Sequence, residues 1–280
     1  MTRITNKFQA PTLRAILALA AVFSLTSSSR GQSVLYDDFS GNQIDPAKWI
    51  GAGGDQYLRE TERTLVPERE HPQGHRLKLA QRAYSDVLTD TNGTGGIFGL
   101  AFTRPDSVND ITFRVEVENT STIACASNPT QETLAGAEFR GRFFNTEIFP
   151  GPSSFGDVEA VISLTRHANL GPELHVEALF EHCDDFFCGA RTNLGFAELG
   201  VTSVGRPTTL HIKWDHPNHQ FVFQMNSKAS VTLPYTVPDF SPPSVTVKSI
   251  DLARVIPNCT SFPRPLASME AYFDNIVARP

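Results

Sequence analysis

The chain has 280 residues, of which 40% are hydrophobic and 19% are charged, and its formal net charge at pH 7 is −6. This length suits one large domain or two small ones. An acidic chain lacks the positive surface that binds nucleic acid or anionic membranes, so we expect neither as a partner.

Residues 1–32 predict a secretory signal peptide. Arg3, Lys7 and Arg14 precede an apolar run over residues 15–25, and small and polar residues follow. This order of charged, apolar and small segments is typical of such signals. The apolar run is shorter than the roughly 20 residues that span a bilayer, and a signal anchor is the alternative interpretation. We expect cleavage between residues 29 and 33 and a secreted, periplasmic or extracellular product that does not insert into a membrane.

The remaining residues, 34–280, predict a single domain, because they contain no internal repeat and no linker of biased composition. The leader holds four basic residues and no acidic one, so its loss leaves 20 basic and 30 acidic residues and a net charge of −10. This charge disfavours polyanionic substrates unless a local basic patch is present.

Hydrophobic residues alternate with polar ones in many short segments, and helical periodicity is almost absent. The predicted strands are residues 76–81, 96–102, 110–118, 135–143, 156–164, 173–181, 208–214, 220–225, 245–252 and 270–278. Residues 215–218 predict the turn of a hairpin between two of them. Because each strand has one apolar face, the sequence predicts an all-β protein in which two antiparallel sheets pack face to face.

The four cysteines predict two disulfides, since an even number in an exported chain is typical of disulfide bonding. Three pairings are possible. We expect Cys183 and Cys188 to close a short loop, which leaves Cys125 to meet Cys259. A metal site is the alternative, although the spacing is not that of common zinc sites and only His182 lies beside a cysteine.

The two ends of the domain carry a resemblance to a known family. The stretch YDDFSGNQIDPAKW, residues 36–49, matched with EAYFDNIV, residues 270–277, resembles the concanavalin A-like lectin and glucanase superfamily, which includes LamG-like domains. The resemblance implies a jelly-roll sandwich in which the first and last strands lie side by side. It also implies that Phe39 and Phe273 are in the core and that Trp49 closes one end. The fold hosts unrelated activities, so function does not follow from it.

The same resemblance implies no cofactor other than a structural calcium, for which Asp38 and Asp274 are the matching positions. Calcium takes six to eight oxygen ligands, and two carboxylates alone do not make a site. The alternative is that both aspartates bond backbone amides in turns.

Charged residues on the polar faces of the middle strands are candidate ligand-binding residues, since proteins that resemble this fold bind sugars on one concave sheet. These candidates are Glu138, Arg140, Arg142, Asp157, Glu159, His175 and Glu177. The alternative interpretation is a set of cross-strand ion pairs on a solvated face.

Asp157 and Glu159 are candidate catalytic residues. The strand rise separates them by about 6.6 Å, which falls in the range of roughly 6.5 to 9.5 Å between the carboxyls of inverting glycosidases. Phe155 stands where the related glucanases have their nucleophile, so the motif is incomplete. Glu138-Phe139-Arg140 is similar to part of an alginate-lyase strand, but the other lyase motifs are missing.

The sequence therefore favours a secreted, non-catalytic carbohydrate-binding protein whose partner is a carbohydrate or an extracellular polymer. The first alternative is a glycan-degrading enzyme of the same fold, either a glycoside hydrolase or a polysaccharide lyase. A structural or adhesive envelope protein is the second, and it would expose an apolar patch.

Overall fold

The computed structural model describes residues 33–41, 43–51, 66–67, 71–72, 76–85 and 87–280. Apart from two short 3-10 helices, η1 (Pro105–Ser107) and η2 (His216–Asn218), the regular structure in these residues is β-strand. The predicted leader, residues 1–32, lies outside them, and the contacts gather residues 31–280 into one compact unit. No helix in the described part of the chain is long and apolar enough to cross a membrane.

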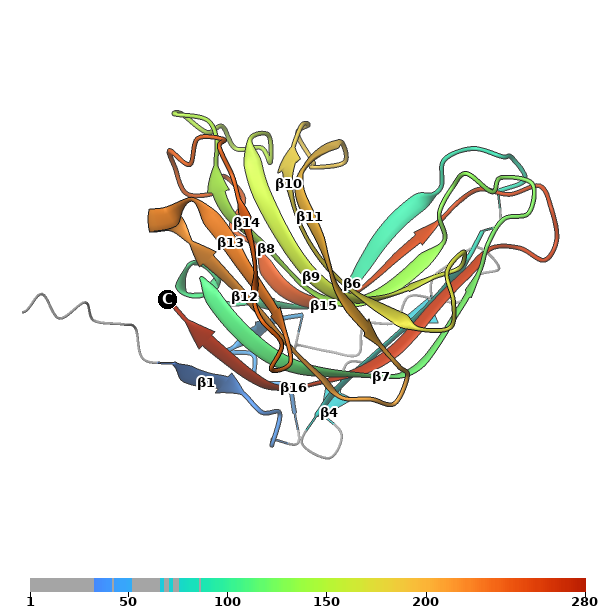
Figure 1. The fold of residues 1–280 in the computed structure, drawn as a ribbon, viewed down its shortest axis with the longest axis horizontal. Helices are drawn as coiled ribbons and strands as arrows, with labels where there is room; N and C mark the ends of the chain where they lie inside the picture. Colours follow the sequence, from blue (N-terminus) through green and yellow to red (C-terminus); the bar gives the residue numbers. More distant parts are fainter. Residues whose placement is uncertain (1–32, 42, 52–65, 68–70, 73–75, 86) are drawn as a thin grey trace, which may run out of the picture. The chain divides into compact units, whose positions relative to one another are not determined.

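The strands form two antiparallel sheets, as predicted, and Figure 1 shows them as two layers of long, bent strands. The first sheet has nine strands: β14 (Val231–Pro234), β13 (Gln220–Met225), β12 (Thr208–Asp215), β7 (Asp110–Ile123), β16 (Leu266–Arg279), β5 (Leu77–Tyr84) and β3 (Val66–Pro67) in order, with β1 (Val34–Asp37) paired to β16 and β4 (His71–Pro72) paired to β5.

The second sheet has seven strands and carries the candidate site on its outer face. Their order is β11 (Arg191–Thr202), β10 (Leu174–Cys183), β9 (Asp157–His167), β8 (Leu134–Asn145), β15 (Lys248–Ile256), β6 (Thr94–Phe102) and β2 (Trp49–Ile50). The middle strands β8, β9 and β15 therefore have a neighbour on both sides, which fixes the positions of their side chains.

Phenylalanine rings from both sheets meet in the core between them. Phe113 of β7 lies with its ring centroid 6.4 Å from that of Phe139 of β8, and Phe221 of β13 lies 5.1 Å from Phe180 of β10. All four side chains are fully buried. Burial of each such ring stabilises the fold by about 2 to 3 kcal/mol, so the alternation of apolar residues along the strands accounts for the layered architecture.

The first and last strands pair, as the resemblance implied. Val34 lies opposite Ala278 and Asp37 opposite Ile276 in the antiparallel pair β1 and β16, and Figure 1 shows the two strands side by side. Phe39 and Phe273 are both buried in the common core. The chain thus has a two-sheet antiparallel jelly-roll sandwich, as predicted.

Asp37, the acidic residue that ends β1, explains the unusual sequence of residues 37–49, here called the entry segment. The Trp49 indole Nε1 donates to Asp37 Oδ2 at 2.7 Å, and the Phe39 backbone N–H donates to Asp37 Oδ1 at 3.0 Å. The Lys48 Nζ lies 3.3 Å from Asp37 Oδ1, and the Trp49 ring stacks on Phe39. Asp37 is only 6% exposed, so its carboxylate satisfies buried donors that water does not reach.

Both expected disulfides are present. Cys183 bonds to Cys188 across five positions, and Cys125 bonds to Cys259 across 134 positions. The metal alternative for the cysteines is therefore wrong, because all four sulfurs are in disulfides.

All ten predicted strands are present, most of them longer than expected, and η2 forms the expected turn between β12 and β13. The edge strand β11 was not predicted. Gly195 and Gly200 interrupt its alternation, and most of its side chains are exposed or half-buried. An edge strand with little apolar surface carries no clear two-residue period.

Candidate functional site

A groove of about 610 Å³ lies on the outer face of the seven-stranded sheet. Its lining comes from the middle strands β8, β9 and β10, from β15 and β6, and from the disulfide-closed loop at Cys188 and Gly189. This volume lies in the range of about 300 to 1,000 Å³ that is usual for ligand pockets. The groove is therefore the candidate binding site.

The pleat of the strands directs polar side chains into this groove. Phe139 of β8 points into the core, so its neighbours Glu138 and Arg140 point outward. The register places Glu138 opposite Ser163 of β9 and Ser163 opposite Glu177 of β10. These three side chains form one row across the groove floor.

Glu159 lies at the centre of a network of guanidinium groups. Arg140 Nη1 donates to Glu159 Oε1 at 2.7 Å, and Arg191 Nη1 donates to the same oxygen at 2.8 Å. Arg140 Nε also donates to Glu138 Oε1 at 2.8 Å, and Arg191 Nη1 to Glu181 Oε2 at 3.2 Å. Because Glu159 is only 2% exposed, these bonds fix the groove floor and leave Glu159 little freedom to contact a ligand.

A second carboxyl group, Asp251 of β15, lies directly opposite Glu138 on the neighbouring strand. Both residues are less than 5% exposed. The backbone of Gly99 on β6 passes so close that a Cβ there would lie 2.5 Å from Asp251 Oδ1. A glycine at this position therefore gives the carboxyl group its space.

These two carboxyl groups have raised pKa values. The pKa of Asp251 is raised to about 7, mainly by burial; the hydrogen bond from the Ser249 hydroxyl opposes this rise and the charge of Glu138 adds to it. Burial also raises the pKa of Glu138, although Arg140 acts in the opposite direction. Near neutral pH the pair can therefore hold or release a proton beside the groove, which only Glu138 of the two lines.

Asp157 lies away from the groove, in a fully buried position at the start of β9. Its carboxylate accepts from Asn145 Nδ2 at 2.7 Å and from the backbone N–H groups of Ser244 and Val245 at 2.6 and 3.1 Å. Arg142 lies in the same buried cluster, 3.4 Å from Asp157. The structure thus does not bring Asp157 and Glu159 together in the groove, and these bonds join the β14–β15 segment to β9.

Glu177 lines the groove and is held by a histidine that sequence reasoning did not select. The His167 ring is placed between Glu132 and Glu177, at 2.5 Å from Glu132 Oε1 and 2.9 Å from Glu177 Oε1. These hydrogen bonds raise the pKa of His167 to about 9. His175 lies beside this cluster and bonds to Glu198 at 2.9 Å, outside the lining of the groove.

The positions implied for calcium do not form a ligand set in the described residues. Asp38 accepts from the backbone N–H of Ser40 at 3.1 Å, and Asp274 accepts from the backbone and side chain of Asn275 at 2.7 and 2.8 Å. Neither belongs to a group of three acidic, His or Cys side chains close enough to share an ion. Structural calcium remains a prediction.

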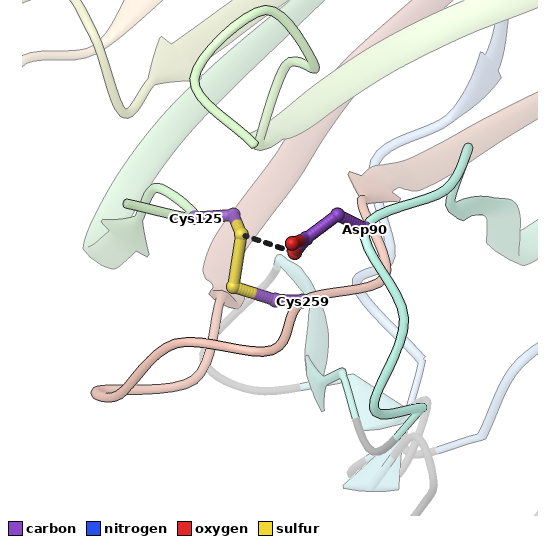
Figure 2. A group of neighbouring side chains, drawn as sticks. All are labelled: Asp90, Cys125 and Cys259. Carbon is purple, nitrogen blue, oxygen red and sulfur yellow. Dashed lines mark hydrogen bonds between the residues drawn. A yellow bond between two sulfur atoms is a disulfide. The ribbon is translucent and has the colours of Figure 1, made fainter. Parts of the chain in front are cut away.

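One cluster of potential metal ligands does occur, formed by Asp90, Cys125 and Cys259 (Figure 2). The two sulfurs are joined in a disulfide and are not thiolates. The Asp90 carboxylate accepts from the Ser127 hydroxyl at 2.6 Å and from the backbone N–H of Thr260 at 2.9 Å. The cluster therefore ties three segments of the chain together.

Exposed aromatic rings lie on loops beside the groove. Phe186 and Phe187, 56% and 84% exposed, belong to the same disulfide-closed loop as Cys188, which lines the groove. The backbone N–H of Ser154, in the loop between β8 and β9, donates to the Phe186 carbonyl at 2.9 Å. That loop also exposes Phe149 and Phe155. Flat apolar rings next to a polar groove are a combination that suits sugar rings.

Sequence comparison assigns the chain to no known family, since it matches no family profile and no curated protein. Solved structures that are similar to this chain include the following three. LamAcat from Zobellia galactanivorans has 11% identity and a TM-score of 0.46, with 89% of this chain and 96% of that chain covered. The κ-carrageenase from Pseudoalteromonas carrageenovora, in complex with an oligotetrasaccharide of κ-carrageenan, has 9% identity and a TM-score of 0.47, covering 93% and 100%. The lectin UEA-II complexed with galactose has 12% identity and a TM-score of 0.32, covering 79% and 95%. No activity follows from similarities of this size.

Proposed function

We propose that this protein binds carbohydrate in the groove of the seven-stranded sheet and that it works outside the cell. The observation that carries the proposal is the groove itself, in which fixed carboxylate and guanidinium groups lie beside exposed aromatic rings. Sugar hydroxyls both donate and accept hydrogen bonds, so a floor of paired acidic and basic groups offers partners for both. The two disulfides support an oxidising, extracellular location.

A pair of substitutions tests the site without breaking its ion pairs. Leu179 lines the middle of the groove and is only half-buried, so Leu179→Trp would fill the groove. Thr232→Trp on β14 adds the same ring to an exposed position on the other sheet and serves as the matched control. We expect binding to a glycan array to fall at least about tenfold for the first variant, about 1.4 kcal/mol, and to stay unchanged for the second. Equal binding by both variants would show that the groove is not the binding site.

A second candidate function is cleavage of a polysaccharide in the same groove, as a glycoside hydrolase or a lyase. The observation that favours it is the pair Glu138, which lines the groove, and Asp251, which lies opposite it on β15; both have raised pKa values. General acid and base catalysis requires groups that exchange protons near the working pH.

The two functions are separated by measuring reducing-sugar release and the absorbance of unsaturated uronates. Cleavage that is lost in Asp251→Asn and Glu138→Gln, with glycan binding retained, would favour the enzyme. Cleavage that these variants retain would contradict a role for the pair. The same assay on Asp157→Asn and Glu159→Gln tests the two catalytic candidates selected from the sequence.

A further inference from the structure

A second cavity, of about 330 Å³, lies at one end of the sandwich and is separate from the groove. Phe143 of β8 and Lys248 of β15 come from the seven-stranded sheet, and Trp214 comes from β12 of the other sheet. The segment after β14, with Phe240, supplies a further wall. The cavity is thus walled by side chains from both sheets and from the segment after β14.

Lys248 is a buried amine in the wall of this cavity. It is 3% exposed and lies opposite Gly141 on the core-facing side of the sheet. A Cβ at Gly141 would lie 2.7 Å from the Lys248 Cγ, so the glycine makes room for the lysine stem. Among the described residues, no carboxylate lies within ion-pair distance of the Lys248 Nζ.

The hydrogen bonds of Lys248 match those of a neutral amine. Nζ donates to the Pro105 carbonyl at 3.0 Å and to Asn109 Oδ1 at 3.3 Å. A neutral amine has two N–H groups, so these two acceptors use both and leave its lone pair free. Burial lowers the pKa of Lys248 to about 7, and the negative charge of Asp106 offsets only part of that effect. About half of the molecules therefore carry a nucleophilic amine at neutral pH.

The aromatic and proline side chains of the walls favour a ligand with an apolar body. The Nζ of Lys248 lies 4.5 Å from the centroid of the Phe143 ring. Trp214 stacks on His216 with ring centroids 4.7 Å apart, and its Nε1 donates to the Tyr235 hydroxyl at 2.9 Å, which fixes the plane of the indole. The Phe143 and Trp214 rings touch edge to face, with centroids 6.1 Å apart, so a ligand would pack on their cavity side and against the exposed ring of Phe240.

We propose that Lys248 forms an imine with a small aldehyde or ketone that has an apolar body and lies in this cavity, against Phe143 and Phe240. The lone pair of Nζ attacks the carbonyl carbon and forms a C–N bond. The carbonyl oxygen then leaves as water with the two amine protons, and a C=N bond remains. No oxidant, reductant or metal takes part. This inference is independent of carbohydrate binding in the groove.

Reductive trapping tests the proposal in the unmodified protein. The protein is incubated with benzaldehyde and cyanoborohydride at pH 7, and the benzylated lysines are identified by peptide mass spectrometry. Lys213 and Lys228, which are more exposed, serve as internal controls. An ordinary lysine, with a pKa of about 10.4, is neutral about 1,000-fold less often at pH 7 than Lys248. Burial slows the access of benzaldehyde to Lys248 and reduces this advantage. We therefore expect Lys248 to react at least about tenfold, and not about 1,000-fold, faster than the controls.

Two further readouts complete the test. Raising the pH from 7 to 9 should increase the rate at Lys248 only about twofold, because about half of its amines are already neutral at pH 7. The reaction of an ordinary lysine amine increases about 100-fold over the same range. Benzaldehyde should also quench Trp214, and Lys248→Arg should abolish the trapped adduct. Labelling of Lys248 no faster than that of Lys213, or quenching without any adduct at Lys248, would overturn the proposal.

Discussion

Replacement of Asp37 should destabilise the protein strongly, although the residue lies near the start of the domain. Its carboxylate accepts from the indole of Trp49 and from the backbone N–H of Phe39, and it pairs with Lys48. A hydrogen bond to a charged group contributes roughly 1.5 to 3 kcal/mol, and a buried donor left without a partner carries a penalty of similar size. We therefore expect Asp37→Ala to lower the free energy of unfolding by about 3 to 5 kcal/mol.

Asp37→Asn keeps one carbonyl oxygen as an acceptor and loses the charge, so we expect about half of that effect. The neighbouring Asp38 is the matched control, because it is half-buried and, among the described residues, its carboxylate accepts from the Ser40 N–H and from no buried side chain. Asp38→Ala should unfold at the same urea concentration as the unaltered protein. Urea unfolding followed by circular dichroism measures all three variants. A loss below about 1 kcal/mol for Asp37→Ala, or equal losses for Asp37→Ala and Asp38→Ala, would refute this account of the entry segment.

Three further predictions concern charge and cross-links. The pKa of Asp251 is raised to about 7, so the folded state holds a proton that the unfolded state releases near pH 4, and stability should fall as pH rises from about 4 to 7. Urea titrations of Asp251→Asn should lack this component. The pKa of His167 is raised to about 9, so its contribution to the free energy of unfolding is complete below about pH 6.5 and is lost as pH rises through 9. In urea titrations, the stability of His167→Gln should depend less on pH in this range. Loss of the Cys125–Cys259 disulfide should lower the free energy of unfolding by about 5 kcal/mol against about 2 kcal/mol for Cys183–Cys188, because the closed loops differ in length. Equal losses in paired Cys→Ser variants would contradict that reasoning.

Much of the fold could be predicted because it depends on local patterns. The alternation around Phe113 and Phe139 specifies strands with one buried face, and the segment around Asp37 and Trp49 indicates how the chain enters the sandwich. The edge strand β11 was missed because its side chains have little apolar surface to alternate.

The candidate site was only partly accessible from the sequence. Glu138, Arg140 and Glu177 could be selected because each lies on the polar face of a middle strand. Asp251 could not be paired with Glu138, since 113 positions separate them and only the register of β15 on β8 makes them neighbours. Asp157 shares its strand face with Glu159, but the β14–β15 segment covers that end of the strand. Strand periodicity carries no information about which loop covers a position.

The carboxylate that Arg140 and Arg191 share has an evolutionary consequence. A descendant that lost Glu159 alone would break two charged hydrogen bonds at once and leave Arg140 with Glu138 and Arg191 with Glu181, whereas one that lost either arginine would keep the other bond to Glu159. Among distant relatives, change should therefore begin at an arginine, and a neutral residue at position 159 should accompany altered residues at both arginine positions.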